Sequence, residues 1–142
     1  MSNKFYGIDI HKKYATISVL NDKGEEIEFI NKCANLEEYI KKMEEGDHTA
    51  IEACTGSFHW EDKIEGRGAT CDIINPYKFK IIRESWNKTD KHDARNMSNG
   101  LWLSYIQKQF KLPTVEKPAK EIRELRRLFS LYDQIGLVPK IK

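Results

Sequence analysis

The sequence predicts an α/β protein built on a five-stranded mixed sheet with helices on its flanks. Near the N-terminus, three short segments alternate apolar and polar residues or are rich in β-branched residues, which indicates strands joined as hairpins. Further along, two more short strands each follow a segment with helical periodicity, and this alternation is typical of parallel strands joined by helical crossovers. Hairpins combined with crossovers predict a mixed sheet with helices on both faces.

The first three strands are predicted from a run of short alternating segments. The first covers 5–10 ("FYGIDI"), where Gly7 permits the close approach of another segment. Residues 14–20 place Ala, Ile and Val on one face and Thr and Ser on the other. The composition of 21–24 ("NDKG") predicts a turn, and 25–30 alternates again. These residues therefore predict an antiparallel meander.

Helices and strands then alternate along the chain. A helix is predicted over 35–46, with Asn35 as its N-cap and a glycine at its end. The elements that follow it are a strand at 48–53, a helix at 57–68, a strand at 70–74 and a helix at 75–86. Because crossovers between parallel strands are right-handed, the fourth strand is expected to run parallel to the first and beside it. This order matches the layout of ribonuclease-H-like proteins.

The last part of the chain predicts two more helices, at 90–110 and 119–135, with a linker at 111–118. The second of these helices is basic and amphipathic. Its apolar residues recur at the spacing of a short heptad seam and are Ile122, Leu125, Phe129 and Tyr132. We therefore divide the chain into one domain over 1–110 and a segment over 111–142 that holds the linker and the start of a coiled-coil helix.

Charge is unevenly spread along the chain, although its net value is only +2. Residues 1–66 carry 8 Lys or Arg and 14 Asp or Glu, whereas residues 67–142 carry 16 and 8. A basic second half is compatible with a phosphate-bearing partner, and equally with a solvated charged surface. Short apolar runs predict no membrane span, and three widely spaced cysteines predict a reduced, cytoplasmic protein.

Two acids lie inside segments that are otherwise apolar. Asp9 falls within the first predicted strand, and Glu52 falls at the end of the fourth, in "AIEACTG". A charge in such a place costs free energy unless it is paired or bound to a metal. Alternatively, Asp9 is exposed at the strand end or pairs with Lys12. If the two strands are parallel neighbours, both acids reach the same end of the sheet, where sites form in open α/β folds.

Two further acids, Asp90 and Asp93, are three residues apart in "KTDKHDA". One interpretation is helix capping, which contributes about 1 kcal/mol through the free N–H groups of the first turn. The other is that both acids point to one side, as residues at i and i+3 of a helix do, and face Asp9 and Glu52. The two interpretations are compatible.

Four crowded carboxylates repel one another, and divalent cations relieve that repulsion. Mg²⁺ takes hard oxygen ligands and keeps some of its water. Two such ions about 4 Å apart hold the attacking and leaving oxygens of a phosphodiester displacement. Together the four acids therefore predict a magnesium site that acts on nucleic acid.

Three blocks of sequence hold these acids. They are "YGIDIHKKYATISVLNDKGE" (6–25), "IEACTGSFHW" (51–60) and "INPYKFKIIRESWNKTDKHDARNMS" (74–98). The blocks resemble the N-terminal RuvC-like domain of the DEDD insertion-sequence transposases, which are RNA-guided, serine-assisted recombinases. The family's acids match Asp9, Glu52, Asp90 and Asp93. The resemblance covers roughly residues 4–130, and its most specific part is the Asp-x-x-Asp pair at its distance from Asn-Pro.

The resemblance implies a ribonuclease-H-like fold, with Mg²⁺ (which Mn²⁺ can replace) at four catalytic acids. It implies a role in DNA transposition, binding of DNA and a structured guide RNA, and assembly into dimers or tetramers. The basic residues expected to contact phosphates are Lys12, Lys88, Lys91, Arg95, Arg123, Arg126 and Arg127. His11, two residues after Asp9, is a further candidate for contact with the site.

The chain departs from the family in its length. Family members carry a C-terminal domain with a serine nucleophile, and no serine of this sequence stands in a matching motif. We therefore expect that this polypeptide does not complete recombination alone. The alternatives are a non-catalytic module that binds nucleic acid and dimerises, a Holliday-junction resolvase-like nuclease, and a fragment of an actin-like ATPase. The last is considered because residues 7–20 also resemble the phosphate-binding hairpin of the actin-like fold. Trp60 is interpreted as a core aromatic residue, and a platform for base stacking is the alternative.

Overall fold

A computed structural model gives the fold and describes residues 3–54, 56–84, 92–106 and 111–115. Within these ranges, strands form one five-stranded sheet in the order β3-β2-β1-β4-β5. The strands are β1 (Phe5–Ile10), β2 (Ala15–Leu20), β3 (Glu26–Cys33), β4 (His48–Glu52) and β5 (Thr70–Ile74). The helices are α1 (Leu36–Ile40), α2 (Ser57–Glu65), α3 (Pro76–Glu84) and α4 (Asp93–Ile106).

The sheet is mixed, as the sequence predicts. β1 pairs antiparallel with β2, and β2 pairs antiparallel with β3, so the predicted meander is confirmed. β4 runs parallel to β1 and beside it, and β5 runs parallel to β4. This arrangement follows from the right-handed crossover between parallel strands. It brings the ends of β1 and β4, and the acids they carry, to the same end of the sheet.

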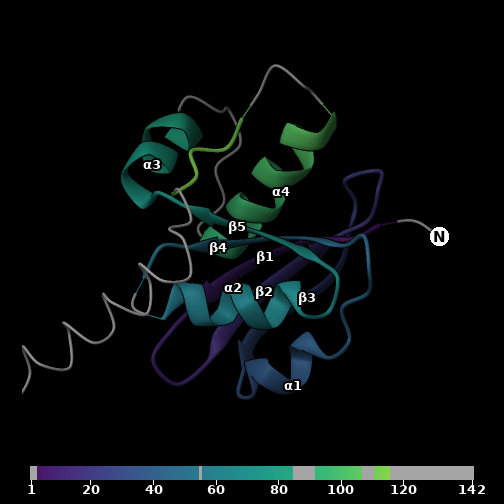
Figure 1. The fold of residues 1–142 in the computed structure, drawn as a ribbon. Helices are drawn as coiled ribbons and strands as arrows, with labels where there is room; N and C mark the ends of the chain where they lie inside the picture. The colour runs from purple at the N-terminus through teal and green to yellow at the C-terminus, as the bar shows by residue number, and fades with distance from the viewer. Residues whose placement is uncertain (1–2, 55, 85–91, 107–110, 116–142) are drawn as a thin grey trace, which may run out of the picture.

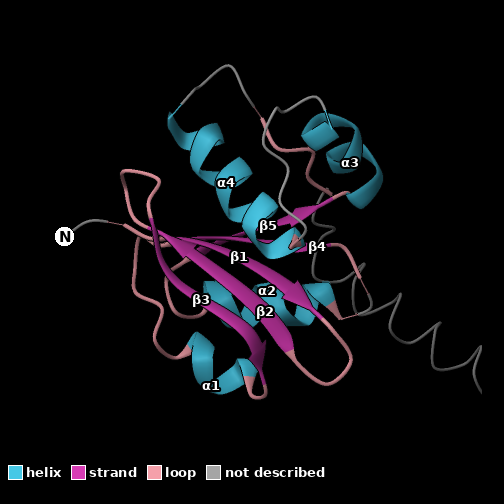
Figure 2. Cartoon of the chain, turned by 180° about the vertical axis from the view of Figure 1, so that it is seen from behind, coloured by secondary structure: helices cyan, strands magenta, loops and turns pink. Residues whose placement is uncertain are grey.

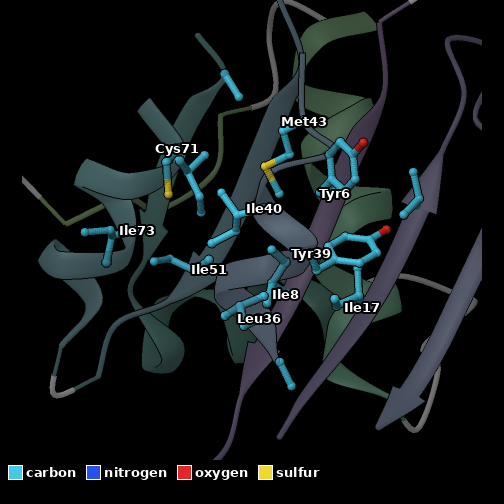
Figure 3. Packing of buried hydrophobic residues seen from close by; sticks show 14 residues of the cluster. Tyr6, Ile8, Ile17, Leu36, Tyr39, Ile40, Met43, Ile51, Cys71 and Ile73 are labelled. Carbon is cyan, nitrogen blue, oxygen red and sulfur yellow. The ribbon is translucent and has the colours of Figure 1, made fainter. Parts of the chain in front are cut away.

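Helices cover both faces of the sheet. Figures 1 and 2 show α1 and α2 on one face and α3 and α4 on the other. Each face has its own apolar core, and Figure 3 shows the one beneath α1 and α2, which includes Ile8, Ile17, Ile51, Leu36 and Met43. The other core includes Phe5, Ala50, Met97 and Leu101.

The alternation of each strand decides which face its acid takes. Successive residues of a strand point to opposite faces of the sheet. Ile8 packs into the core beneath α1 and α2, whereas Phe5 packs into the core beneath α4. Asp9 therefore lies on the α4 face, two residues beyond Gly7. Glu52 lies on the same face, two residues beyond Ala50, and Gly7 and Ala50 are partners in the β1–β4 register.

Helix α4 lies unusually close to β1 and β2. A Cβ atom built on Gly7 would lie 2.1 Å from the carbonyl oxygen of Ala94 and 2.5 Å from the backbone nitrogen of Ser98. The small side chains of Ala94 and Ser98 face the sheet and are fully buried. A hydrogen bond of 2.9 Å joins the hydroxyls of Ser18 and Ser98 across this contact. The glycine and the two small residues therefore fix the height of α4 above the sheet.

We expect the Ser98→Ala variant to lose about 1 kcal/mol of unfolding free energy, the usual net value of a buried hydrogen bond. The loss should stay near this value because the Ser18 hydroxyl retains the Glu26 carboxylate at 3.0 Å as a partner. Urea unfolding of the variant and the wild type measures the difference. A loss above about 3 kcal/mol would mean that the hydroxyl pair does more than join α4 to β2.

The main departure from the predicted elements is the early end of α1. The helix ends at Ile40, whereas the sequence predicts a helix to residue 46. The chain continues in tight turns because the Asp47 carboxylate accepts hydrogen bonds from the backbone N–H groups of Glu44 and Lys4. These bonds hold the segment at the start of β4, and they depend on Lys4, which is distant in sequence. The third strand also extends further than predicted, to Cys33.

The predicted linker begins beside the sheet. Thr114 forms an antiparallel bridge with Ile74, and the backbone N–H of Val115 donates to the carbonyl oxygen of Ile73 at 2.7 Å. Residues 111–115 therefore cover the outer edge of β5. The predicted helix at 119–135 lies outside the described residues. Within the described ranges, none of the helices has the length and apolar character that crossing a membrane requires.

Candidate metal centre

Three of the predicted acids meet at one end of the sheet. Asp9 comes from β1, Glu52 from the last position of β4 and Asp93 from the first turn of α4. One carboxylate oxygen of each lies within 4.8 Å of the others. All three side chains are partly buried. The close seating of α4 on the sheet is what places Asp93 beside the two strand acids.

The separation of these oxygens suits a small divalent cation. Oxygen ligands of Mg²⁺ lie at 2.0–2.1 Å, so two ligands on opposite sides of one ion are about 4 Å apart. The observed limit of 4.8 Å exceeds this by less than 1 Å, which small side-chain rotations can close. Three carboxylates with neutral oxygen ligands from water form a donor set typical of Mg²⁺ or Mn²⁺. The residues therefore fit such an ion.

The electrostatics of Asp9 favour a cation in the same way. Burial raises the pKa of Asp9, and the neighbouring Asp93 carboxylate raises it further. The His11 imidazole, whose Nε2 lies 3.1 Å from Asp9 Oδ2, lowers the pKa of Asp9 and offsets part of that effect. The negative form of Asp9 is therefore unfavourable in the metal-free protein. A bound divalent cation would favour the ionised carboxylate and offset this cost.

Asp72 is an acid away from this group whose burial also raises its pKa, with a smaller contribution from Glu65. When folding raises the pKa of an acid, the ionised form of that acid destabilises the folded protein. The free energy of unfolding is therefore lower at pH values above the raised pKa than below it. We therefore expect Asp72→Asn to be more stable than the wild type at pH 7. The difference should vanish well below the ordinary value of 3.8, where both side chains are neutral. Urea unfolding at the two pH values tests this, and a less stable variant at pH 7 would contradict it.

Helix α4 begins at Asp93, three residues later than predicted. The carbonyl oxygen of His92 accepts hydrogen bonds from the backbone N–H groups of Arg95 and Asn96, so His92 precedes the first helical residue. Asp93 then lies in the first turn, where a negative charge interacts favourably with the helix dipole. The predicted cap and fourth ligand, Asp90, lies outside the described residues, as do Lys88 and Lys91.

The remaining predicted contacts are placed as follows. Lys12 is exposed in the loop between β1 and β2, next to His11. Arg95 Nε lies 3.0 Å from Glu26 Oε1, and its guanidinium lies 3.8 Å from the centre of the Phe29 ring. A phosphate would have to compete with these partners, so contact of Arg95 with nucleic acid stays a prediction. Arg123, Arg126 and Arg127 lie outside the described residues.

Cys54 lies close to the group, since partial burial and the Glu52 and Asp9 carboxylates raise the pKa of its thiol. The thiol is therefore neutral at physiological pH and a poor ligand, because metals bind the thiolate.

No protein-family model matches the chain, and no curated protein is similar to it at a significant level.

Several contacts around the centre were not expected from the sequence. The Ser18–Ser98 hydroxyl pair and the Glu26–Arg95 ion pair both tie α4 to the neighbouring strands. In the sequence, the available signal is the small size of Ser18 in the second predicted strand and of Ala94 and Ser98, which are four residues apart in the predicted helix. The partners are 80 and 69 residues apart, and only the folded sheet brings them together.

Proposed function

We propose that the chain is the RuvC-like, ribonuclease-H-like domain of a DEDD-type transposase and that it binds Mg²⁺ for phosphodiester chemistry on DNA. The observation that carries the proposal is the meeting of Asp9, Glu52 and Asp93 from three separate elements, with oxygens within 4.8 Å of one another. The mixed five-stranded sheet with helices on both faces is compatible with this fold. DNA, a structured guide RNA and further copies of the chain are the partners that the proposal entails.

In this function the residues have distinct roles. Asp9, Glu52 and Asp93 would hold the ion, with Asp90 as the fourth ligand. The His11 ring, 3.1 Å from Asp9, restricts the orientation of that carboxylate. When bound, the divalent cation supplies charge stabilisation at a phosphate oxygen and a water of lowered pKa. Lys12, which follows His11 in the exposed loop after β1, would neutralise a phosphate of the bound strand.

Cleavage of DNA by the full chain tests the proposal. Single-stranded, double-stranded and branched oligonucleotides are incubated with Mg²⁺, with Mn²⁺ or with EDTA, in the presence and absence of structured RNA. We expect strand scission that requires the metal and that is lost in Asp9→Asn while binding of the oligonucleotide persists. Binding without scission under every metal condition would instead identify the non-catalytic module, and scission that survives EDTA would contradict the metal mechanism.

A further inference from the structure

A cavity of about 220 Å³ opens beside the metal centre, on the α1 and α2 side of the loop that follows β1. Its walls come from the loop at 11–14, from the residues that lead into α1 and from Trp60 of α2. His11 belongs to both places, because it lines the cavity while its Nε2 lies 3.1 Å from Asp9 Oδ2. His11 is therefore the residue that the cavity and the proposed metal centre share.

The charge of the cavity is positive. Lys12 and Lys13 line it and are exposed, and neither pairs with an acid in the part of the chain that the structure describes. The acid that lines it, Glu37, is neutralised by Lys63 Nζ at 3.0 Å. Two unpaired ammonium groups at the mouth of a cavity attract a phosphate.

The wall of the cavity is aromatic. Trp60 is only partly buried, and it packs against the core with part of its ring while it lines the cavity. Tyr14 also lines the cavity, but its ring already contacts the His11 ring at 4.6 Å between centres and lies 5.6 Å from Lys32 Nζ. The Trp60 ring also has an aromatic neighbour, the His59 ring at 5.2 Å between centres and 72° between planes, and its two-ring face is the larger surface for a flat ligand. Trp60 therefore combines the core packing expected of it with a surface that lines the cavity.

The volume limits what can bind. Pockets for drug-sized ligands and cofactors measure about 300–1,000 Å³, so a cavity of about 220 Å³ accepts one small planar group. A positive rim with an aromatic wall is the combination by which proteins hold unpaired bases of single-stranded nucleic acid. An apolar ligand would use the aromatic wall alone.

We propose that this cavity binds one unpaired base of the nucleic-acid strand that enters the metal centre, with the base against Trp60 and its phosphate at Lys12 and Lys13. The proposal rests on the proposed function, because the nucleic-acid strand that places a base in the cavity is the one that reaches the metal centre. It assigns the loop at 11–14 a role in holding substrate on the side opposite α4. A free nucleotide has the same chemistry, and the test distinguishes the two.

Fluorescence anisotropy of a labelled single-stranded 12-mer of thymidine, measured with EDTA, tests binding without the metal. Base stacking is worth about 1–3 kcal/mol per base. Because about 1.4 kcal/mol corresponds to a tenfold change in affinity, we expect Trp60→Leu to weaken binding roughly 5- to 150-fold. Trp60→Phe keeps an aromatic face and should restore most of the affinity, which separates stacking from a general loss of packing. Thermal unfolding of each variant confirms that it is folded.

Lys13→Gln is compared with Lys23→Gln, which removes the same charge from the turn between β2 and β3 at the other end of β2. We expect Lys13→Gln to weaken binding and to lower its salt dependence more than Lys23→Gln does. Equal effects of the two lysine variants, or a Trp60→Leu variant that binds as the wild type does, would overturn the proposal. So would a thymidine mononucleotide that binds as tightly as the 12-mer.

Failure of this proposal is distinguishable from failure of the proposed function. Trp60 and Lys13 are not among the acids, so their variants should bind Mn²⁺ as the wild type does in calorimetry. If metal-dependent scission persists while the cavity variants bind the 12-mer normally, the cavity is not a base site and the proposed function stands. If the wild type binds no oligonucleotide at all, both are wrong.

Discussion

Replacing Gly7 by alanine is expected to destabilise the domain by about 3 kcal/mol or more, the upper end of the range for overpacking a core. The new Cβ would lie 2.1 Å from the Ala94 carbonyl oxygen and 2.5 Å from the Ser98 nitrogen. Both are backbone atoms of α4, so no rotation of a side chain can relieve the clash. The helix must move away from the sheet. Domains have only about 5–15 kcal/mol of stability, so the loss is a large fraction of the total.

The control for this variant is Gly56→Ala. Gly56 has φ +87, and a Cβ there would meet nothing within 4 Å, so alanine carries only the cost of a left-handed backbone. That cost is about 1–2 kcal/mol. Urea unfolding of both variants separates the clash from the backbone strain. If Gly7→Ala is no less stable than Gly56→Ala, α4 does not lie as close to β1 as the structure places it.

Replacing Asp9 by asparagine is expected to weaken binding of Mn²⁺ by more than about 100-fold. Loss of a group that only contacts a metal ligand already costs about 10- to 100-fold in affinity, and Asp9 would be a ligand itself. In the wild type, metal at 100 times its Kd stabilises the fold by about 2.7 kcal/mol. For a chain of 142 residues this corresponds to a rise of roughly 8 °C in Tm. The variant should show a rise of at most about 1 °C at the same metal concentration.

Without metal, the same substitution is expected to increase the stability of the protein. Burial and Asp93 raise the pKa of Asp9, so the ionised carboxylate destabilises the fold at neutral pH. The protein therefore loses this stability as the pH rises above 3.8. Asp9→Asn should therefore be more stable than the wild type in EDTA at pH 7. Asp72→Asn is the matched control, because it should gain stability in EDTA and keep the full response to metal. A variant at Asp9 that still responds to metal would exclude it as a ligand.

Much of the fold follows from local patterns in the sequence. The meander is visible in the alternation of 14–20 and in the turn at 21–24. The crossover rule places β4 beside β1, and the parity of each strand then turns Asp9 and Glu52 to one face. The two acids inside apolar strands are the signal for a site that the strand pattern itself gives. The structure places their carboxylates and that of Asp93 together.

The features that the sequence did not predict depend on contacts between distant residues. α1 ends early because Asp47 accepts a hydrogen bond from the backbone of Lys4, 43 residues away. The close approach at Gly7 is predicted and confirmed, but its partners Ala94 and Ser98 are not predicted, because no local periodicity reveals them. The cavity at Trp60 likewise forms only when α2 meets the loop after β1. Helical periodicity marks Trp60 as apolar, but it does not show that part of the ring stays open to a ligand.

The most direct test of the metal centre is a crystal of the full chain soaked in Mn²⁺, examined by anomalous scattering. We expect an anomalous peak between the carboxylates of Asp9, Glu52 and Asp93, with oxygen ligands at distances near 2.2 Å, slightly longer than the 2.0–2.1 Å of Mg²⁺. The same soak of Asp9→Asn should lack the peak. Carboxyl groups of these residues more than about 10 Å apart cannot share a metal pair with a spacing of about 4 Å, and that result would contradict the proposed centre.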